Sequence, residues 1–120
     1  MVVDDSESIA MAARVALADI GGLTVEICSS GEEALEKVAE FSPDLILLDI
    51  NMPDMDGPAV FKSLRGRRES SSIPVIFLTA QIEERDSCIA MGALDVIAKP
   101  FDPMTLSETV QSIWNGRSGA

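Results

Sequence analysis

The stretch Pro43–Pro53, with the sequence PDLILLDINMP, decides how the rest of the chain is interpreted. Its apolar run at 45–48 is too short for a helix, and no alternate residue in it is polar. Such a run is typical of a strand buried on both faces in a parallel sheet. It ends at Asp49, and a loop that carries proline, aspartate and glycine follows. Because open α/β sheets bind ligands beyond the carboxyl ends of their strands, Asp49 is the first candidate functional residue.

Apolar segments and helical periodicity alternate along the whole chain, on both sides of this stretch. This alternation predicts an α/β fold in which right-handed crossovers join parallel strands and helices cover both faces of the sheet. Residues 23–28 alternate apolar and polar side chains, which is typical of an edge strand. The predicted strands are 1–3, 23–28, 45–48, 75–78 and 94–98, and the predicted helices are 7–20, 31–41, 58–64, 83–91 and 103–114.

Capping signals place the starts of several helices. Ser6 can cap the first helix, and Ser30 opens a capping box for the second. Asp102 followed by Pro103 supplies a cap and a proline at the first helical position for the last helix. Residues 116–120 are predicted to form a tail outside that helix.

Length and composition limit the possible functions. A chain of 120 residues predicts a single domain, residues 1–120, and 47% hydrophobic with 24% charged residues is ordinary for a globular protein. The sequence has no apolar run long enough to span a membrane and no signal peptide pattern at its start, so we expect a cytoplasmic protein without membrane partners. A net charge of −11 would repel a phosphate backbone, which argues against direct nucleic-acid binding.

The two cysteines are expected to be structural. Cys28 and Cys88 lie in a chain without a secretion signal, so we predict free, buried thiols and no disulfide. The chain has no histidine and no Cys-x-x-Cys pair, which excludes a zinc site of the usual kind.

Polar side chains stand at the carboxyl ends of most predicted strands: Asp4 and Asp5, Asp49, Thr79 and Lys99. Carboxyl ends of parallel strands meet at one edge, so these groups should converge. Two carboxylates about 4 Å apart repel by about 1 kcal/mol in water and about 4 kcal/mol at an effective dielectric constant near 20. Lys99 and a hard divalent cation could offset this repulsion, and ligands that are all oxygens favour Mg²⁺.

This combination resembles the receiver domain of two-component response regulators, and the resemblance covers the whole chain. A receiver has the flavodoxin-like fold, with five parallel strands in the order 2-1-3-4-5. The matching motifs are Val3–Asp5, Leu48–Gly57, Leu78–Ala80 and Lys99–Phe101.

The resemblance implies a role for each candidate residue. Asp49 would accept a phosphoryl group from a phosphohistidine on a histidine kinase or a histidine phosphotransfer protein. Mg²⁺ or Mn²⁺ would be held by Asp4, Asp5, Asp49 and the backbone carbonyl of Asn51, and the phosphoryl oxygens would contact Thr79 and Lys99.

The resemblance also indicates how a signal would leave the domain. Many receivers have an aromatic residue three positions before the lysine, and here that position is Val96. We therefore expect Thr79 to switch without an aromatic partner, and a cis peptide before Pro100. The readout would be a downstream protein or a fused output domain outside this chain, contacted through the fourth helix, fifth strand and fifth helix.

Two other functions fit parts of the pattern. A degenerate receiver would bind proteins constitutively without accepting phosphate. A phosphatase with an aspartyl nucleophile usually carries a second acid two residues later, where this chain has Asn51, so turnover of external substrates is not expected. Asp54 and Asp56 resemble a calcium loop, but Pro53 occupies a ligand position, and we interpret them as turn residues.

Overall fold

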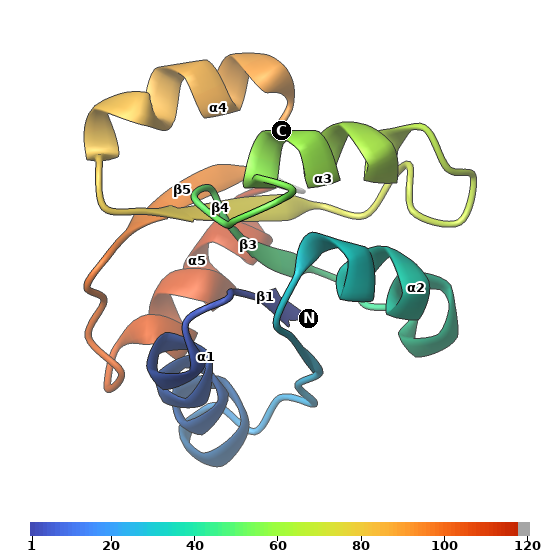
Figure 1. Ribbon diagram of the computed structural model, residues 1–120. Helices are drawn as coiled ribbons and strands as arrows, with labels where there is room; N and C mark the ends of the chain where they lie inside the picture. The colour runs from blue at the N-terminus through green and yellow to red at the C-terminus, as the bar shows by residue number, and fades with distance from the viewer. Residues whose placement is uncertain (118–120) are drawn as a thin grey trace.

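The computed structural model describes residues 1–117 and contains one sheet of five parallel strands, in the predicted order β2-β1-β3-β4-β5. Helices lie against both faces of this sheet (Figure 1). The strands are β1 (Val2–Val3), β2 (Ile27–Cys28), β3 (Ile46–Asp49), β4 (Val75–Thr79) and β5 (Asp95–Ala98). The helices are α1 (Glu7–Arg14), α2 (Gly31–Phe41), α3 (Gly57–Arg65), α4 (Arg85–Met91) and α5 (Leu106–Arg117). A π-helical segment (Val15–Ile20) extends α1, and a 3₁₀ turn (Ile82–Glu84) precedes α4.

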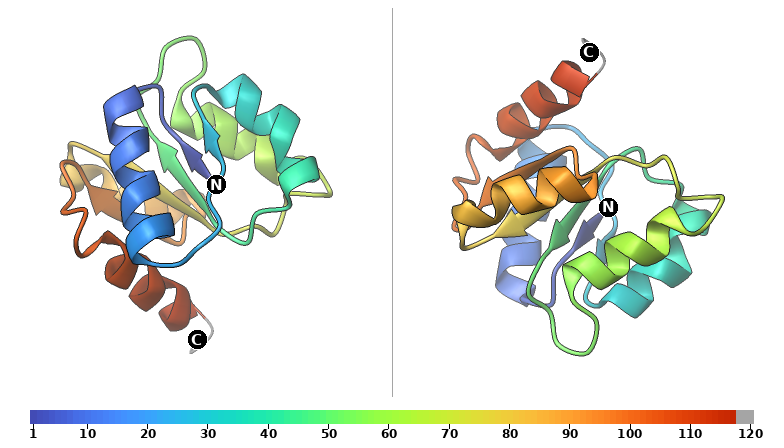
Figure 2. Two further views of the ribbon diagram at one scale, coloured as in Figure 1. Left: turned by 90° about the horizontal axis from the view of Figure 1, so that it is seen from below. Right: turned by 90° about the horizontal axis from the view of Figure 1, so that it is seen from above.

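Each face of the sheet has its own apolar core. Helices α1 and α5 cover one face, and α2, α3 and α4 cover the other (Figure 2). The central strands β3 and β4 are buried on both faces, as their unbroken apolar runs predict. The core beneath α2, α3 and α4 includes Val38, Leu48, Phe61, Phe77 and Cys88, and the core beneath α1 and α5 includes Leu17, Leu47, Ile76, Leu106 and Val110.

Both cysteines are free and buried, as predicted. Burial raises the pKa of the Cys28 thiol to about 11, so this residue is a protonated thiol at neutral pH. Val96 lies on β5 opposite Phe77 and is buried in the same core. An apolar side chain therefore occupies the position where many receivers have their aromatic residue.

The predicted serine caps are confirmed. The Ser6 side chain accepts a hydrogen bond from the Ile9 N–H at the start of α1, and Ser30 accepts one from the Glu33 N–H at the start of α2. Asp56 caps α3 in the same way through Ala59. These bonds satisfy backbone donors that have no partner within the helix.

The last helix and the second strand differ from the prediction. Helix α5 begins at Leu106 and not at Pro103, because residues 103–105 form a turn. Asp102 caps this turn, since its side chain accepts from the Met104 N–H and its carbonyl accepts from the N–H groups of Thr105 and Leu106. The helix then continues through Gly116 to Arg117, although the sequence predicts that these residues belong to the tail, and residues 118–120 lie outside the described part. Strand β2 has two residues because its partner β1 offers only Val2 and Val3 for pairing.

The first helix changes its hydrogen bonding halfway along its length. Residues 15–20 form a π-helix, and Gly21 donates its N–H to the carbonyl of Ala16, five residues earlier. This segment packs against α5 and buries Ala16 and Leu17. No helix in the described range 1–117 combines the length and the apolar character that a membrane span requires.

Candidate functional site

The carboxyl ends of β1, β3 and β5 bring two aspartates and a lysine together. Lys99 Nζ lies 2.9 Å from Asp49 Oδ1 and 3.1 Å from Asp4 Oδ2. The side chains of Asp4 and Asp49 are 0% and 3% exposed, and that of Lys99 is 15% exposed. The second oxygen of Asp4 accepts a 2.8 Å bond from the Ser6 N–H. The central charges of the site are therefore buried, and each forms an ion pair or hydrogen bond within the site.

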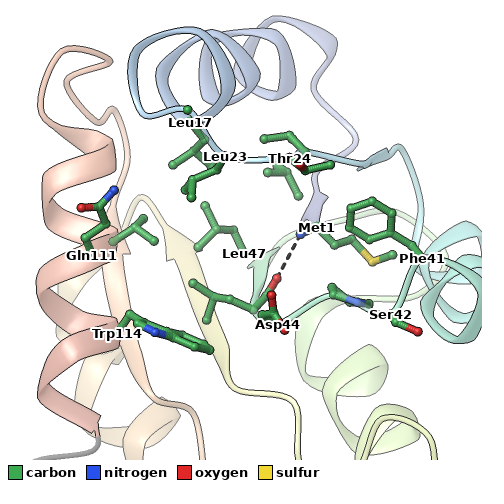
Figure 3. A pocket seen from close by; sticks show the side chains of 16 residues that line it. Met1, Leu17, Leu23, Thr24, Phe41, Ser42, Asp44, Leu47, Gln111 and Trp114 are labelled. Atoms are coloured by element: carbon green, nitrogen blue, oxygen red, sulfur yellow. Dashed lines mark hydrogen bonds between the residues drawn. The ribbon is translucent and has the colours of Figure 1, made fainter.

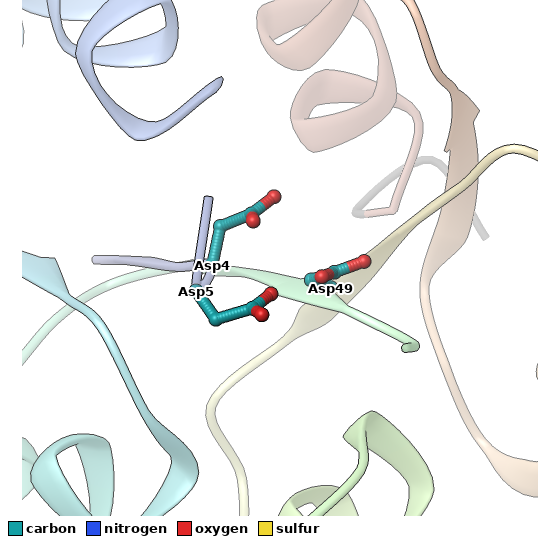
Figure 4. A group of neighbouring side chains, drawn as sticks. All are labelled: Asp4, Asp5 and Asp49. Carbon is teal, nitrogen blue, oxygen red and sulfur yellow. The ribbon is translucent and has the colours of Figure 1, made fainter. Parts of the chain in front are cut away.

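Asp5 completes a group of three carboxylates at this edge. It follows Asp4 after β1 and is exposed, whereas Asp49 ends β3, and the three side chains point toward one space (Figure 4). One oxygen from each residue lies within 4.8 Å of the other two. With all groups ionised, three carboxylates and the Lys99 ammonium carry a net charge of −2. Oxygen donors with this charge fit a hard divalent cation such as Mg²⁺, which is bound through a few carboxylates and retained waters.

The local environment shifts the pKa of both central groups. Burial raises the pKa of Asp49, the bond from Lys99 opposes that change, and the negative charge of Asp4 adds to it. Burial alone would lower the pKa of Lys99, but its bonds to Asp49 and Asp4 outweigh burial and raise it. Lys99 is therefore a fixed cation beside a carboxylate that is costly to keep ionised.

Two further features hold Asp49 in position. The Asn51 N–H donates to Asp49 Oδ1 over 3.4 Å, while the Asn51 side chain is exposed. Gly57 packs against the backbone of the same strand end, since a Cβ there would lie 2.5 Å from the Asp49 carbonyl oxygen. The peptide bond between Lys99 and Pro100 is cis, as predicted.

Thr79 ends β4 at the same edge and is fully buried. Its Oγ1 accepts a 2.9 Å bond from the Gln81 N–H. The hydroxyl lies 3.3 Å from the Gln81 carbonyl oxygen and 3.4 Å from Glu84 Oε1. The hydroxyl is therefore bonded to the loop that leads into α4.

A separate cavity of about 600 Å³ lies at the opposite end of the sheet, near the amino ends of β1 and β3. Figure 3 shows Leu17, Leu47 and Trp114 around it, with the Met1 amine bonded to a backbone oxygen. That bond runs 3.0 Å to the Leu45 carbonyl. Its described lining residues are mostly apolar, and no set of charged groups converges among them, so the acidic edge is the better candidate for chemistry.

The structure brings most of the predicted site residues together. Asp4, Asp5, Asp49 and Lys99 form one cluster, and Thr79 ends the neighbouring strand. The roles of the Thr79 hydroxyl and the Asn51 carbonyl toward a ligand stay predictions. Sequence reasoning missed Glu84, whose contact with Thr79 depends on the 3₁₀ turn between them.

Comparisons with known proteins agree with this geometry. The family model described as "Response regulator receiver domain" matches residues 1–111. The chain is 40% identical over 115 residues to the alkaline phosphatase synthesis transcriptional regulatory protein PhoP of Bacillus subtilis, covering 94% of this chain and 47% of that protein. It is 42% identical over 103 residues to the DNA-binding transcriptional regulator NtrC of Escherichia coli, covering 84% and 21%.

Solved structures of response regulators and receiver domains are also similar to this chain. The chemotaxis response regulator CheY4 of Vibrio cholerae superposes with a TM-score of 0.84 at 36% identity, covering 93% of this chain and 94% of that one. The receiver domain of NtrX from Brucella abortus also gives a TM-score of 0.84, at 27% identity and with 95% and 96% covered. The chain spans about half the length of the first of these curated relatives and a fifth of the second.

Proposed function

The chain belongs to the receiver domain family of response regulators, and on this premise we propose that residues 1–120 are a single phosphoacceptor domain that switches by phosphorylation of Asp49. The observation that carries the proposal is the position of Asp49, which is buried, bonded to the Lys99 ammonium and clustered with the carboxylates of Asp4 and Asp5. The proposed donor is a phosphohistidine on a partner histidine kinase or histidine phosphotransfer protein in the cytoplasm.

The transfer is a displacement at phosphorus. A carboxylate oxygen of Asp49 attacks, an O–P bond forms as the P–N bond of the phosphohistidine breaks, and the imidazole keeps the electron pair. Because Lys99 and Asn51 both bond to Oδ1, we assign the attack to Oδ2. The product is an acyl phosphate, a covalent species known for aspartate nucleophiles.

The protein lowers the repulsion between two anions that must meet. Lys99 holds a positive charge 2.9 Å from Asp49 and could contact the incoming phosphoryl oxygens. We assign Asp4, Asp5, Asp49 and the Asn51 carbonyl as the residues that would hold Mg²⁺ or Mn²⁺. When bound, the ion would neutralise negative charge on the carboxylates and on the phosphoryl group.

Phosphorylation would change the contacts of Thr79. The added group carries about −1.5 to −2 charges and new acceptor oxygens, by analogy with other phosphorylated side chains. The Thr79 hydroxyl could donate to one of them, which would draw the loop after β4 toward the site. A downstream protein or an output domain would read that change on the face formed by α4, β5 and α5.

Intact mass measurement after incubation with acetyl phosphate and Mg²⁺ tests this function. We expect one added phosphate on the wild type and none on Asp49→Asn. Asp44→Asn is the matched control, because Asp44 is an exposed aspartate near the other end of β3. Loss of the adduct with EDTA would support the metal requirement. No adduct on the wild type would indicate a constitutive protein-binding module, and continuous release of inorganic phosphate would indicate a phosphatase.

A further inference from the structure

The proton of the Thr79 hydroxyl is already in use in this structure. A hydroxyl has a single proton to donate, and two acceptors compete for it, the Gln81 carbonyl at 3.3 Å and the Glu84 carboxylate at 3.4 Å. Both acceptors belong to the turn that joins β4 to α4. A bond from Thr79 to a phosphoryl oxygen on Asp49 therefore requires that these contacts are given up.

Glu84 connects Thr79 to the start of α4. It is the last residue of the 3₁₀ turn and directly precedes Arg85, the first residue of α4. Its side chain does not cap the helix, and its N–H donates to the Gln81 carbonyl over 3.1 Å. The half-buried carboxylate reaches back to Thr79 instead. One acidic side chain thus links the end of β4 to the helix that follows.

The charge of Glu84 also opposes phosphorylation. A phosphoryl group on Asp49 would put new negative charge at the strand edge that Thr79 shares. The nearby cation Lys99 is already bonded to Asp4 and Asp49 through its ammonium. The Glu84 carboxylate therefore adds repulsion as well as competing for the Thr79 proton.

We infer that Glu84 is a positioning residue that holds the Thr79 hydroxyl on the loop side of the site, and that phosphorylation releases Glu84 together with the start of α4. This inference rests on the proposed function of Asp49. In the unmodified protein Glu84 favours the resting arrangement, because a bond to a charged acceptor is stronger than one to a neutral acceptor. Its removal should make the phosphorylated arrangement easier to reach.

The test compares initial rates of phosphorylation by acetyl phosphate with Mg²⁺, followed by intact mass. In this reaction the P–O bond of acetyl phosphate breaks, an Asp49 oxygen bonds to phosphorus, and acetate leaves with the electron pair. We expect Glu84→Ala to raise the rate about three- to tenfold, a modest change because the lost bond is long. Glu84→Gln keeps an acceptor of the same shape without the charge, and its rate should lie between those of wild type and Glu84→Ala.

Two controls separate this role from a general structural effect. Glu83→Ala removes an exposed carboxylate from the same turn and should leave the rate unchanged. In a Thr79→Val background, Glu84→Ala should lose most of its effect, since the two residues act through one bond. The inference is overturned if neither Glu84 variant exceeds the wild-type rate, if Glu83→Ala gives the same gain, or if the gain persists with Thr79→Val. If the wild type takes up no phosphate, the proposed function fails and this inference fails with it.

Discussion

At the carboxyl ends of β1, β3 and β5, charged side chains are buried against one another, whereas the amino ends of β1 and β3 border an apolar cavity. Each end contains a buried ammonium group. Lys99 lies between two carboxylates, and its pKa is raised. The Met1 amine bonds to the neutral Leu45 carbonyl, and burial lowers its pKa to about 6. Burial alone therefore does not decide whether a buried amine keeps its proton; carboxylate partners at bonding distance do.

The largest expected effect is at the charged end. Lys99→Met should lower the free energy of unfolding by about 3 kcal/mol in EDTA, because it leaves buried carboxylates without their cation. Urea unfolding followed by circular dichroism measures the loss, and Mg²⁺ should restore part of it. Lys37→Met is the matched control, since Lys37 pairs with Glu26 and Glu33 at the surface, and it should cost less than about 1 kcal/mol. Equal losses in the two variants would contradict the comparison.

The Met1 amine should make stability depend on pH between 6 and 8. Its pKa is 8.0 in the unfolded chain and about 6 in the folded one, so in this range the unfolded state binds more protons and stability rises with pH. The full gain from this group is about 2 to 3 kcal/mol, because a pKa difference of one corresponds to about 1.36 kcal/mol. Urea unfolding at several pH values measures it. The chain acetylated at its N-terminus should lack this component, and an unchanged slope after acetylation would rule out the amine as its source.

Gly57→Ala should disturb the charged end through the backbone. The added Cβ would lie 2.5 Å from the Asp49 carbonyl oxygen and 2.8 Å from Ile50 Cα, so one of these segments must move. We expect a loss of about 2 kcal/mol, typical of overpacking, and slower phosphorylation of Asp49. Gly66→Ala is the control, because its Cβ would meet nothing closer than 3.6 Å and should leave stability nearly unchanged. A Gly57→Ala protein with wild-type stability and rate would show that the close approach is unimportant.

The smallest expected effect is an increase in the free energy of unfolding. Asp49→Asn removes a buried carboxylate from an excess of negative charge and leaves Lys99 paired with Asp4. In EDTA we expect the free energy of unfolding to rise by about 1 kcal/mol. Residues that serve function often lower stability, and replacing them then stabilises the fold. Thermal unfolding with and without Mg²⁺ measures the change, and the gain should disappear when the ion is present. A decrease in EDTA would mean that the Lys99 bond to Asp49 outweighs the cost of burial.

The acidic edge could be predicted because it depends on topology more than on side-chain detail. Once the run ending at Asp49 is assigned to a parallel strand, the ends of its neighbours must lie beside it, and this places Asp4, Asp5 and Lys99. The apolar runs of β3 and β4 predict buried strands even when the segments that pair with them are not known. These elements were therefore predictable from local sequence and general rules of sheet geometry.

The parts that were missed depend on contacts between segments. The contact of Glu84 with Thr79 requires a 3₁₀ turn, and a helical pattern from 83 onward gives no sign of it. The length of β2 is limited by β1, which no property of residues 23–28 reveals. Asp102 and Pro103 carry the pattern of a helix start, but the backbone bonds of Asp102 close a turn, and α5 starts only at Leu106.

The π-helical bonding of Val15–Ile20 has a consequence for the length of the chain. Each hydrogen-bonded loop of a π-helix encloses one more residue than a loop of an α-helix, so this segment holds one residue that an ordinary helical path would not need. Shortening the chain by one residue here would convert the segment to regular α-helix and leave the strands in register. Insertions and deletions among related sequences should therefore concentrate between residues 15 and 20, far from the acidic edge.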